Sequence, residues 1–316
     1  MNPVQTCSNT ERRHAGEHLG IMAAVLSSSL GGVNTAVTRY AIGETDPVSL
    51  AGLRFGLGFL LLVPLALTMK CRWPSGRDWP VVAALGFLFF GVFMGLFNLA
   101  LRYTSAARGA LALSTLPLVT MLMAAALKAE PLAARKLVGA LLAIGGVAVT
   151  LLAGLGHAPP RAWRGDVIMV AATVCMAFYS IWSPPFIARS SPLGFVTAGM
   201  GVGSLIVCLL AWLGGGLGAS AFDARQWAAI AYLGILGEAV TFFLWVFALA
   251  RTTATKVTNT IALNPLSASI AATLLIGEPF GRFMVVGTVA VFSGILIAST
   301  ERPVAPANLT TEPTGT

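Results

Sequence analysis

The stretch ALNPLSASIAATLLIGEP, residues 262–279, places Pro265 inside a long apolar run and ends in Glu-Pro. The stretch ALSTLPLVTMLMAAALKAEP, residues 112–131, repeats this frame with Pro117, twelve further residues and a second Glu-Pro. A shift of 148 residues superimposes the two prolines. Chance similarity between apolar segments does not easily reproduce such a frame, so the sequence predicts an internal repeat.

Further positions agree with the same shift. The matching pairs are Gly86 with Gly234, Ala100-Leu101 with Ala248-Leu249, Gly139 with Gly287, and Gly146 with Gly294. Near the front of each half, Pro47 corresponds to Pro192 with a slightly different offset. The repeat therefore extends over most of the chain.

The composition is that of a protein dissolved in lipid. Of the 316 residues, 56% are hydrophobic and 10% are charged, and the mean hydropathy is +0.82. Soluble domains carry about 25% charged residues. Long apolar segments that cross a bilayer must be helices, because their backbone groups find no water to bond with. The sequence predicts an all-α integral membrane protein.

Ten apolar segments have about the 20 residues that a helix needs to cross the hydrocarbon. They are residues 18–40, 47–69, 79–101, 106–127, 135–154, 165–187, 193–214, 226–250, 253–276 and 281–299. The first is too long for a signal peptide and lacks an A-x-A cleavage site. Each half then contains five helices. An odd number makes the second half enter the membrane from the opposite side, which predicts an inverted repeat.

The orientation follows from the positions of Lys and Arg. With a cytoplasmic N-terminus, twelve of the 20 Lys and Arg residues lie in inside segments and seven in outside segments. Cytoplasmic loops carry such an excess, so we expect both termini in the cytoplasm. We expect the membrane to be the plasma (inner) membrane. We expect a cytoplasmic segment at 1–17, repeats at 18–154 and 165–299, and a disordered tail at 300–316.

Several motifs resemble one family of membrane carriers. They are D-P-x6-R (Asp46, Pro47, Arg54), A-L-x-Y-T-S-A (residues 100–106), S-x-x-P-x12-E and G-x6-G; P-x12-E and G-x6-G occur in the first half and again in its repeat. This pattern resembles the EamA branch of the drug/metabolite transporter superfamily. The resemblance implies ten helices in two inverted halves, a central cavity lined mainly by helices 1, 3, 4, 6, 8 and 9, and movement of small metabolites, often their export.

The two halves depart from each other within that pattern. The sequence ALARTTAT, residues 248–255, replaces the Tyr-Thr-Ser motif, and Gly199 stands where Arg54 would repeat. A symmetric binding site is therefore not expected.

Pro117 and Pro265 lie about eleven residues into their spans, near the membrane midplane. A proline lacks the N–H that would bond the carbonyl four residues earlier, so Leu113 and Ile261 lose a helical partner. One interpretation is a static kink that improves packing. The other, favoured by the symmetric placement, is a pair of hinged helices that line a wet cavity.

Two ionisable side chains lie deep in the spans. Arg54 is roughly 10 Å below the outer end of its helix, and Glu238 lies near the centre of the eighth span, at about 1.5 Å per residue. Charges at that depth are costly and should face the bundle interior. Two interpretations stay open. In the structural one, Arg54 and Glu238 form a direct ion pair, or Glu238 is protonated. In the functional one, they bind a zwitterionic solute, or Glu238 carries a coupling proton. Phe90 stands at the position equivalent to Glu238, which favours a role outside the shared scaffold.

Other polar and aromatic residues sort by depth. Asn34 and Asn98 belong to the outer third, Asn264 to the centre, and Tyr179, Trp182, Trp245 and Asn259 to the inner third. We predict that these residues contribute to substrate binding, although Trp182 and Trp245 also suit an interfacial aromatic belt. Glu130 and Glu278 each precede a proline that begins the next helix, and we interpret them as boundary and gate-closing elements.

The remaining function classes can be weighed. The spans contain no HExxH, no GxSxG, no histidine inside the membrane and no aspartate pair, so an enzyme is not expected, and no metal or cofactor is predicted. Only one cation lies deep, which disfavours sugar phosphates. We predict a secondary transporter that exports amino acids or similar amphipathic compounds. A carrier of drugs, nucleosides or sugars, or a non-transporting scaffold or sensor, stays open, as does a homodimer. Small solutes and lipid are the expected partners, and nucleic acid is not.

Overall fold

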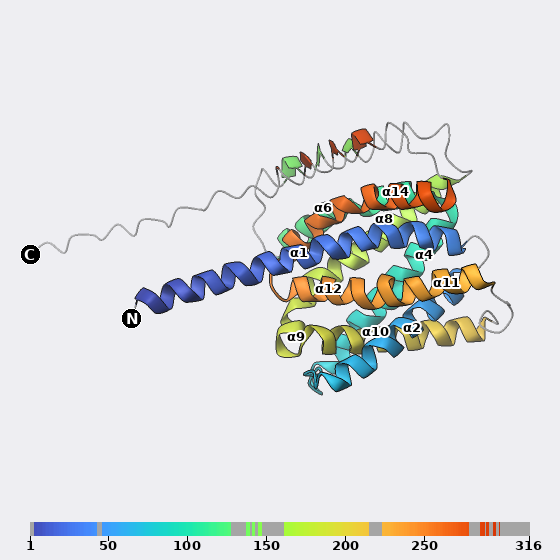
Figure 1. Ribbon diagram of the computed structural model, residues 1–316. Coiled ribbons are helices and arrows are strands. Elements are labelled where there is room, and N and C mark those ends of the chain that lie inside the picture. The colour runs from blue at the N-terminus through green and yellow to red at the C-terminus, as the bar shows by residue number, and fades with distance from the viewer. Residues whose placement is uncertain are drawn as a thin grey trace, which may run out of the picture.

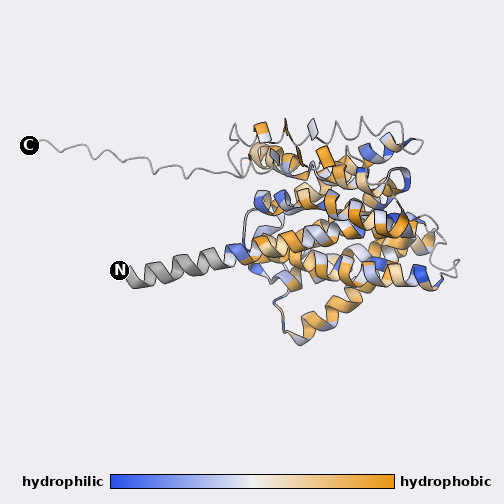
Figure 2. Ribbon diagram, turned by 45° about the horizontal axis from the view of Figure 1, so that its top comes forward, coloured by the Kyte–Doolittle hydropathy of each residue, from blue (hydrophilic) through white to orange (hydrophobic). Residues whose placement is uncertain are grey.

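The computed structural model describes residues 3–42, 46–127, 161–214 and 223–277, together with 137–139, 141–142, 145–146, 285–287, 289–290, 293–294 and 297 (Figure 1). Within these ranges the chain is helical and contains no strand. Hydrophobic residues dominate the long helices, and hydrophilic ones gather toward the helix ends (Figure 2). The prediction of an all-helical membrane protein is confirmed.

Eight helical segments of the described chain are long and apolar enough to cross a membrane. They are Gly16–Ile42, Pro47–Thr68, Trp79–Tyr103, Ala106–Ala126, Ala162–Trp182, Pro192–Leu213, Ala224–Leu249 and Ala254–Ile276. These segments agree with eight of the predicted spans to within a few residues. The other two, 135–154 and 281–299, fall largely outside the described residues, as do Glu130 and Glu278.

Four of the eight described spans are continuous helices. These are α1 (Pro3–Ile42), α2 (Pro47–Thr68), α8 (Ala162–Trp182) and α10 (Pro192–Leu213), with the short α9 (Pro184–Arg189) between the last two. The Asp46 carboxylate caps α2 by accepting from the N–H groups of Val48 and Ser49, and the Ser191 hydroxyl caps α10 by accepting from Gly194. Such caps satisfy N–H groups that a helix leaves unpaired at its start.

The other four spans are interrupted, and the interruptions recur in both halves. The third span runs from α3 (Trp79–Gly86) through a π-helical segment η1 (Phe87–Phe93) into α4 (Met94–Tyr103). Its counterpart runs from α11 (Ala224–Tyr232) through the π-helical η3 (Leu233–Val240) into α12 (Thr241–Leu249). π-helical turns are rare and are frequently found at functional sites.

The two proline-containing spans are broken where the sequence predicts a kink. The fourth consists of α5 (Ala106–Leu113) and α6 (Leu116–Ala126), and Pro117 lies in the first turn of α6. The eighth described span consists of α13 (Ala254–Asn259), a 3₁₀ turn η4 (Thr260–Leu263) and α14 (Asn264–Ile276), and Pro265 lies in the first turn of α14. Proline suits a first turn because the N–H that it lacks would be unpaired there.

One expectation about these prolines is wrong. The Ile261 carbonyl keeps a partner, because the N–H of Asn264 donates to it. The 3₁₀ turn bonds residues three apart and so replaces the bond that Pro265 cannot make.

Packing between the halves comes in matched sets. α1 lies against α14 and α12, and α8 correspondingly lies against α6 and α4 (Figure 1). α2 packs along α10 and also against η3, while α10 packs against η1. Among the described helices, these main contacts between the halves therefore have counterparts with the two halves exchanged.

Ion pairs fasten the helix ends. Arg108 Nη2 lies 2.6 Å from Asp166 Oδ2 and joins α5 to α8, and Lys256 Nζ lies 2.6 Å from Glu17 Oε1 and joins α13 to α1. At the start of α3, the Arg189 guanidinium lies 2.9 Å from Asp78 and holds the pKa of that carboxyl below its ordinary value.

Candidate transport site

A cavity of about 50 Å³ lies between the two halves. Its wall has a polar part on α1, α2, η3, α12 and α14 and an apolar part on η1, α4, α5, α8, α12 and η4. The polar lining residues are Ser27, Ser28, Gly31, Asn34, Thr35, Arg54, Gly237, Thr241 and Asn264. The apolar ones are Phe93, Met94, Phe97, Leu113, Met176, Phe242, Trp245 and Ile261.

Arg54 and Glu238 meet directly. Both Nε and Nη2 of Arg54 contact Oε1 of Glu238, and the two side chains are 1% and 0% exposed. The third guanidinium nitrogen donates to Thr38 Oγ1 at 2.8 Å and to Asn98 Oδ1 at 3.4 Å. Asn98 is held in turn by the Pro47 carbonyl, to which its Nδ2 donates at 3.1 Å. In this conformation the two buried charges neutralise each other.

The pair is sealed by a close approach of α2 to η3. A Cβ atom added at Gly58 would lie 2.9 Å from Glu238 Cβ and 3.0 Å from the Gly234 carbonyl oxygen. A Cβ at Gly234 would lie 2.8 Å from Leu57 Cβ. Only glycine allows the two backbones to come this near. Of the pair, Arg54 lines the cavity, and Glu238 lies behind it.

Asn34 joins α1 to the π-helical segment. Its Nδ2 donates to the Gly237 carbonyl at 3.1 Å and to Thr241 Oγ1 at 3.4 Å. Ser27, two turns earlier on α1, donates to the Thr241 carbonyl at 2.8 Å. Asn34 is 5% exposed, and its Oδ1 has no hydrogen-bond partner in the described structure.

Asn264 begins α14 beside the same face of α1. A Cβ at Gly31 would lie 3.2 Å from Asn264 Nδ2, and one at Gly32 would lie 2.5 Å from the Asn264 carbonyl oxygen. The two glycines therefore let α14 approach α1 at the helix break. Asn264 is 2% exposed, and its Oδ1 also has no partner in the described structure.

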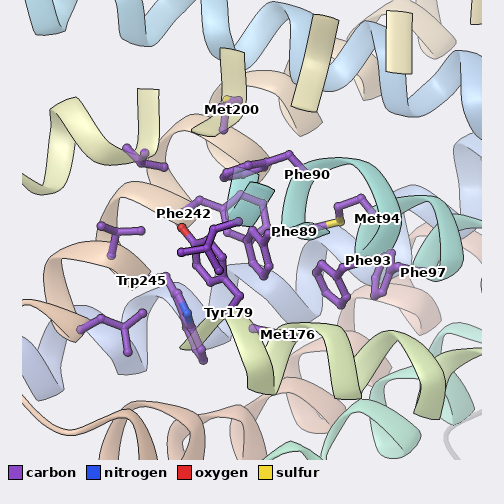
Figure 3. Close-up of a cluster of buried hydrophobic side chains, with 14 of the residues drawn as sticks. Phe89, Phe90, Phe93, Met94, Phe97, Met176, Tyr179, Met200, Phe242 and Trp245 are labelled. Atoms are coloured by element: carbon purple, nitrogen blue, oxygen red, sulfur yellow. The ribbon is translucent and has the colours of Figure 1, made fainter. Parts of the chain in front are cut away.

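An aromatic cluster lies next to the cavity and supplies Phe93, Phe97, Phe242 and Trp245 to its wall (Figure 3). Phe89 stacks on Tyr179 with ring centroids 4.1 Å apart and on Phe93 at 5.0 Å, and Phe242 meets Phe89 edge to face at 5.0 Å. Trp245 lies beside Tyr179 in the close-up and lines the cavity. Tyr179 is buried behind the wall, and neither its hydroxyl nor the Trp245 indole N–H has a partner in the described structure.

The structure brings most of the predicted site residues together and leaves two apart. Trp182 is 43% exposed and stacks on Phe178, with ring centroids 4.9 Å apart, and Asn259 is half-buried outside the cavity wall. Pro117 and Pro265 do not line the cavity either, but Leu113 and Ile261, four residues before them, do. No cluster of metal ligands occurs among the described residues.

Thr38 was missed from the sequence, although it touches Arg54. The signal lies in the membrane-spanning part of α1, where small and polar residues recur at Ser27, Gly31, Asn34 and Thr38. Steps of three and four residues place them on one helix face. Such a stripe marks the face that α1 turns toward the cavity.

Comparison with known proteins identifies relatives along nearly the full chain. A transporter of Bacillus subtilis (strain 168), the uncharacterized YyaM, is 28% identical over 290 residues, which is 90% of this chain and 94% of the relative. The uncharacterized protein PA1977 of Pseudomonas aeruginosa is 30% identical over 88% of this chain and 93% of its own length. A protein of Streptantibioticus cattleyicolor named "probable terminal-alkyne amino-acid exporter" is 28% identical over 80% of this chain and 84% of its own.

A solved crystal structure shares the fold. It superimposes with a TM-score of 0.69 at 21% identity and covers 91% of this chain and 98% of its own. The profile of the EamA-like transporter family matches residues 18–152 and 163–300. The resemblance seen in the motifs is thereby confirmed, and this multi-pass membrane protein belongs to the EamA-like transporter family.

Proposed function

We propose that this protein is a secondary transporter that exports amino acids or similar small amphipathic metabolites across the plasma (inner) membrane by alternating access. The observation that carries the proposal is the cavity between the two halves, which is lined by the polar side chains of Asn34, Arg54 and Asn264 and by aromatic ones. A solute with a charged end and an apolar end matches both kinds of side chain. A relative named as an amino-acid exporter adds support.

The proposed architecture has ten spans in two inverted repeats, 18–154 and 165–299, with both termini in the cytoplasm. The matched packing of α1 and α8 supports a two-fold relation between the halves. So do the caps, because the Ser105 hydroxyl accepts from the Arg108 N–H and the Thr253 hydroxyl, 148 residues later, accepts from the Lys256 N–H. A C-terminal reporter fusion should be active only in the cytoplasm, and periplasmic activity would contradict this topology.

Transport requires the cavity to open. Sites for small molecules typically enclose about 300–1,000 Å³, several times the space of this cavity. The helix breaks before Pro117 and Pro265 supply two places where helices on the cavity wall can bend. In the proposed topology the Arg108–Asp166 pair closes the outer end and the Lys256–Glu17 pair closes the inner end. Glu130 and Glu278 follow each broken helix and would assist in closing.

The proposed binding residues have different parts in the site. Arg54 lines the cavity and would attract the carboxylate of a substrate, while Glu238 and Asn98 hold its guanidinium in place. Asn34, Asn264 and Trp245 contact the solute directly. Tyr179 supports the aromatic wall from behind. Trp182 and Asn259 would reach a solute only in a conformation other than this one.

Counterflow in proteoliposomes tests the proposal. Vesicles loaded with an unlabelled amino acid should accumulate the labelled one faster than empty vesicles, and the chain with Arg54→Gln should not. Flux of nucleosides, drugs or sugars in place of amino acids would move the protein to another carrier class. Absence of any flux, with substrates from all of these classes, would favour a scaffold or sensor.

A further inference from the structure

We infer that the cavity recognises the ammonium group of its substrate through two amide oxygens, Asn34 Oδ1 and Asn264 Oδ1, and takes primary amines with an apolar side chain. The inference rests on the proposed transport function and names the chemical group that the site selects. It assigns the positive end of the substrate to neutral amides and not to Glu238, which is occupied by Arg54 and lies behind the cavity wall.

The hydrogen-bond donors of the polar wall are largely committed. The hydroxyl of Ser27 donates to the Thr241 carbonyl, that of Thr35 to the Gly31 carbonyl at 2.9 Å, and that of Thr241 to the Leu236 carbonyl at 2.8 Å. A hydroxyl has one proton, so each has spent its donor. All three nitrogens of Arg54 likewise face acceptors. What the polar wall still offers is mainly acceptors.

The contacts of Asn34 determine which of its two side-chain amide atoms is the oxygen. A backbone carbonyl can only accept, so the Asn34 atom that faces the Gly237 carbonyl must be the NH₂ group. The other amide atom is then the oxygen, which is buried without a partner. A buried acceptor that stays unpaired costs about 1–3 kcal/mol. A solute that brings N–H donors to this wall removes that cost.

Asn264 places a second amide on the same wall. It packs against Gly31, which precedes Asn34 by one turn of α1, and its Oδ1 is also buried without a partner. Thr38, the next residue on this face, holds Arg54. From Gly31 to Thr38 the helix rises about 10 Å, at roughly 1.5 Å per residue. The wall therefore presents two acceptors at one end and a guanidinium at the other, which suits the two ends of an amino acid.

The aromatic part of the wall selects the rest of the substrate. Phe93, Phe97, Phe242 and Trp245 line the same cavity as the amides. Aromatic faces attract a nearby ammonium as well as an apolar side chain. A primary ammonium has three N–H donors and can satisfy both amide oxygens, whereas a trimethylated nitrogen has none. Apolar amino acids and arylalkylamines therefore fit, and quaternary amines do not.

Binding to the purified full chain in detergent tests the inference with four probes. They are L-phenylalanine, phenethylamine, N,N,N-trimethylphenylalanine and 3-phenylpropionate. We expect the two primary amines to bind, and the trimethylated and amine-free compounds to bind at least about 10-fold more weakly. Asn264→Leu should weaken phenethylamine about 10-fold, whereas Asn264→Asp, which keeps an acceptor, should retain it. Asn34→Leu gives the second test, with thermal unfolding as a check on its folding.

Thr120→Val is the matched control, because the Thr120 hydroxyl is also buried without a partner but does not line the cavity. It should leave binding unchanged. Equal binding of the trimethylated compound, no binding of either primary amine, or full phenethylamine affinity in Asn264→Leu would each overturn the amide assignment. If the amide assignment fails but the protein still catalyses counterflow of some other solute, the transport proposal stands. Absence of flux for every solute would contradict the transport proposal and the amide assignment together.

Discussion

The contact of α2 with η3 and the contact of α10 with η1 occupy corresponding places in the two halves. In the first, a Cβ at Gly58 would lie 2.9 Å from Glu238 Cβ, and in the second a Cβ at Gly203 would lie 2.4 Å from Phe90 Cβ. A Cβ at Gly58 would also lie 3.0 Å from the Gly234 carbonyl oxygen, and a Cβ at Gly203 would lie 3.0 Å from the Gly86 carbonyl oxygen. Gly234 and Gly86 precede Glu238 and Phe90 by four residues. The backbone arrangement is the same in both contacts.

The side chains in these two contacts differ completely. Arg54 fills the space beside Glu238, whereas Gly199 stands at the equivalent place and the Phe90 ring lies 3.5 Å from where its Cβ would be. One contact is therefore a buried ion pair and the other an aromatic ring against a bare backbone. The backbone geometry is shared by the two contacts, and the charged pair belongs to only one of them.

The largest effect should come from breaking the ion pair. Glu238→Gln leaves the Arg54 guanidinium buried without its counter-charge, and removal of one partner from a buried pair costs about 3–5 kcal/mol. Arg54→Gln strands the carboxylate in the same way. Thermal unfolding of the purified protein should show a large loss for each single variant, and Phe90→Leu in the equivalent contact should lose less.

The double variant Arg54→Gln with Glu238→Gln separates structure from transport. It removes both charges, so most of the stability should return, because coupled residues are not additive. Counterflow should stay abolished if Arg54 binds the substrate carboxylate. A double variant that transports normally would show that the pair only stabilises the fold and would exclude Arg54 from the binding site.

The sequence predicts the positions of the helices better than their rotation. The eight described spans and the breaks before Pro117 and Pro265 follow from hydropathy and from the missing proline N–H. Trp182 could not be placed, because its span is apolar on both faces and hydropathy does not then distinguish the lipid side from the cavity side. The π-helical segments η1 and η3 leave no hydropathy signature, since they change backbone bonding and not the side chains.

Most members of the site were predictable, but their pairing was not. Arg54 and Glu238 were expected to face the bundle interior, because deep charges are costly. Whether they contact each other depends on the approach of α2 to η3 at Gly58, a distance between helices that hydropathy cannot predict. The acceptor role of Asn34 likewise follows from the Gly237 carbonyl, which lies 203 residues away in the chain.

A smaller effect should distinguish the glycines of the two contacts. Gly203→Ala forces a methyl group against Phe90 Cβ and the η1 backbone, and such overpacking typically costs about 1–3 kcal/mol. Gly58→Ala should cost somewhat less, because its tightest distance is 2.9 Å. Gly199→Ala finds only ordinary contacts, at 3.4 Å and beyond, and should be neutral. Equal melting temperatures for Gly199→Ala and Gly203→Ala would contradict the close packing of α10 on η1.

The smallest effect should come from the ion pairs at the helix ends, in which Lys256 follows Arg108 by 148 residues and Asp166 follows Glu17 by 149. Side chains of Arg108 and Asp166 are 10% and 13% exposed, while those of Lys256 and Glu17 are 45% and 33% exposed. Exposed pairs contribute about 0–1 kcal/mol and are screened by salt.

Lys256→Ala should therefore change the unfolding free energy by less than about 1 kcal/mol, and high salt should abolish even that change. Arg108→Ala should cost more and depend less on salt, because Asp166 is less exposed than Glu17 and also accepts from Thr104 Oγ1 at 3.0 Å. Thermal unfolding of both variants at two salt concentrations measures the difference. If Lys256→Ala proved the more destabilising, the contact between α13 and α1 would be held more tightly than the contact between α5 and α8, which would contradict this prediction.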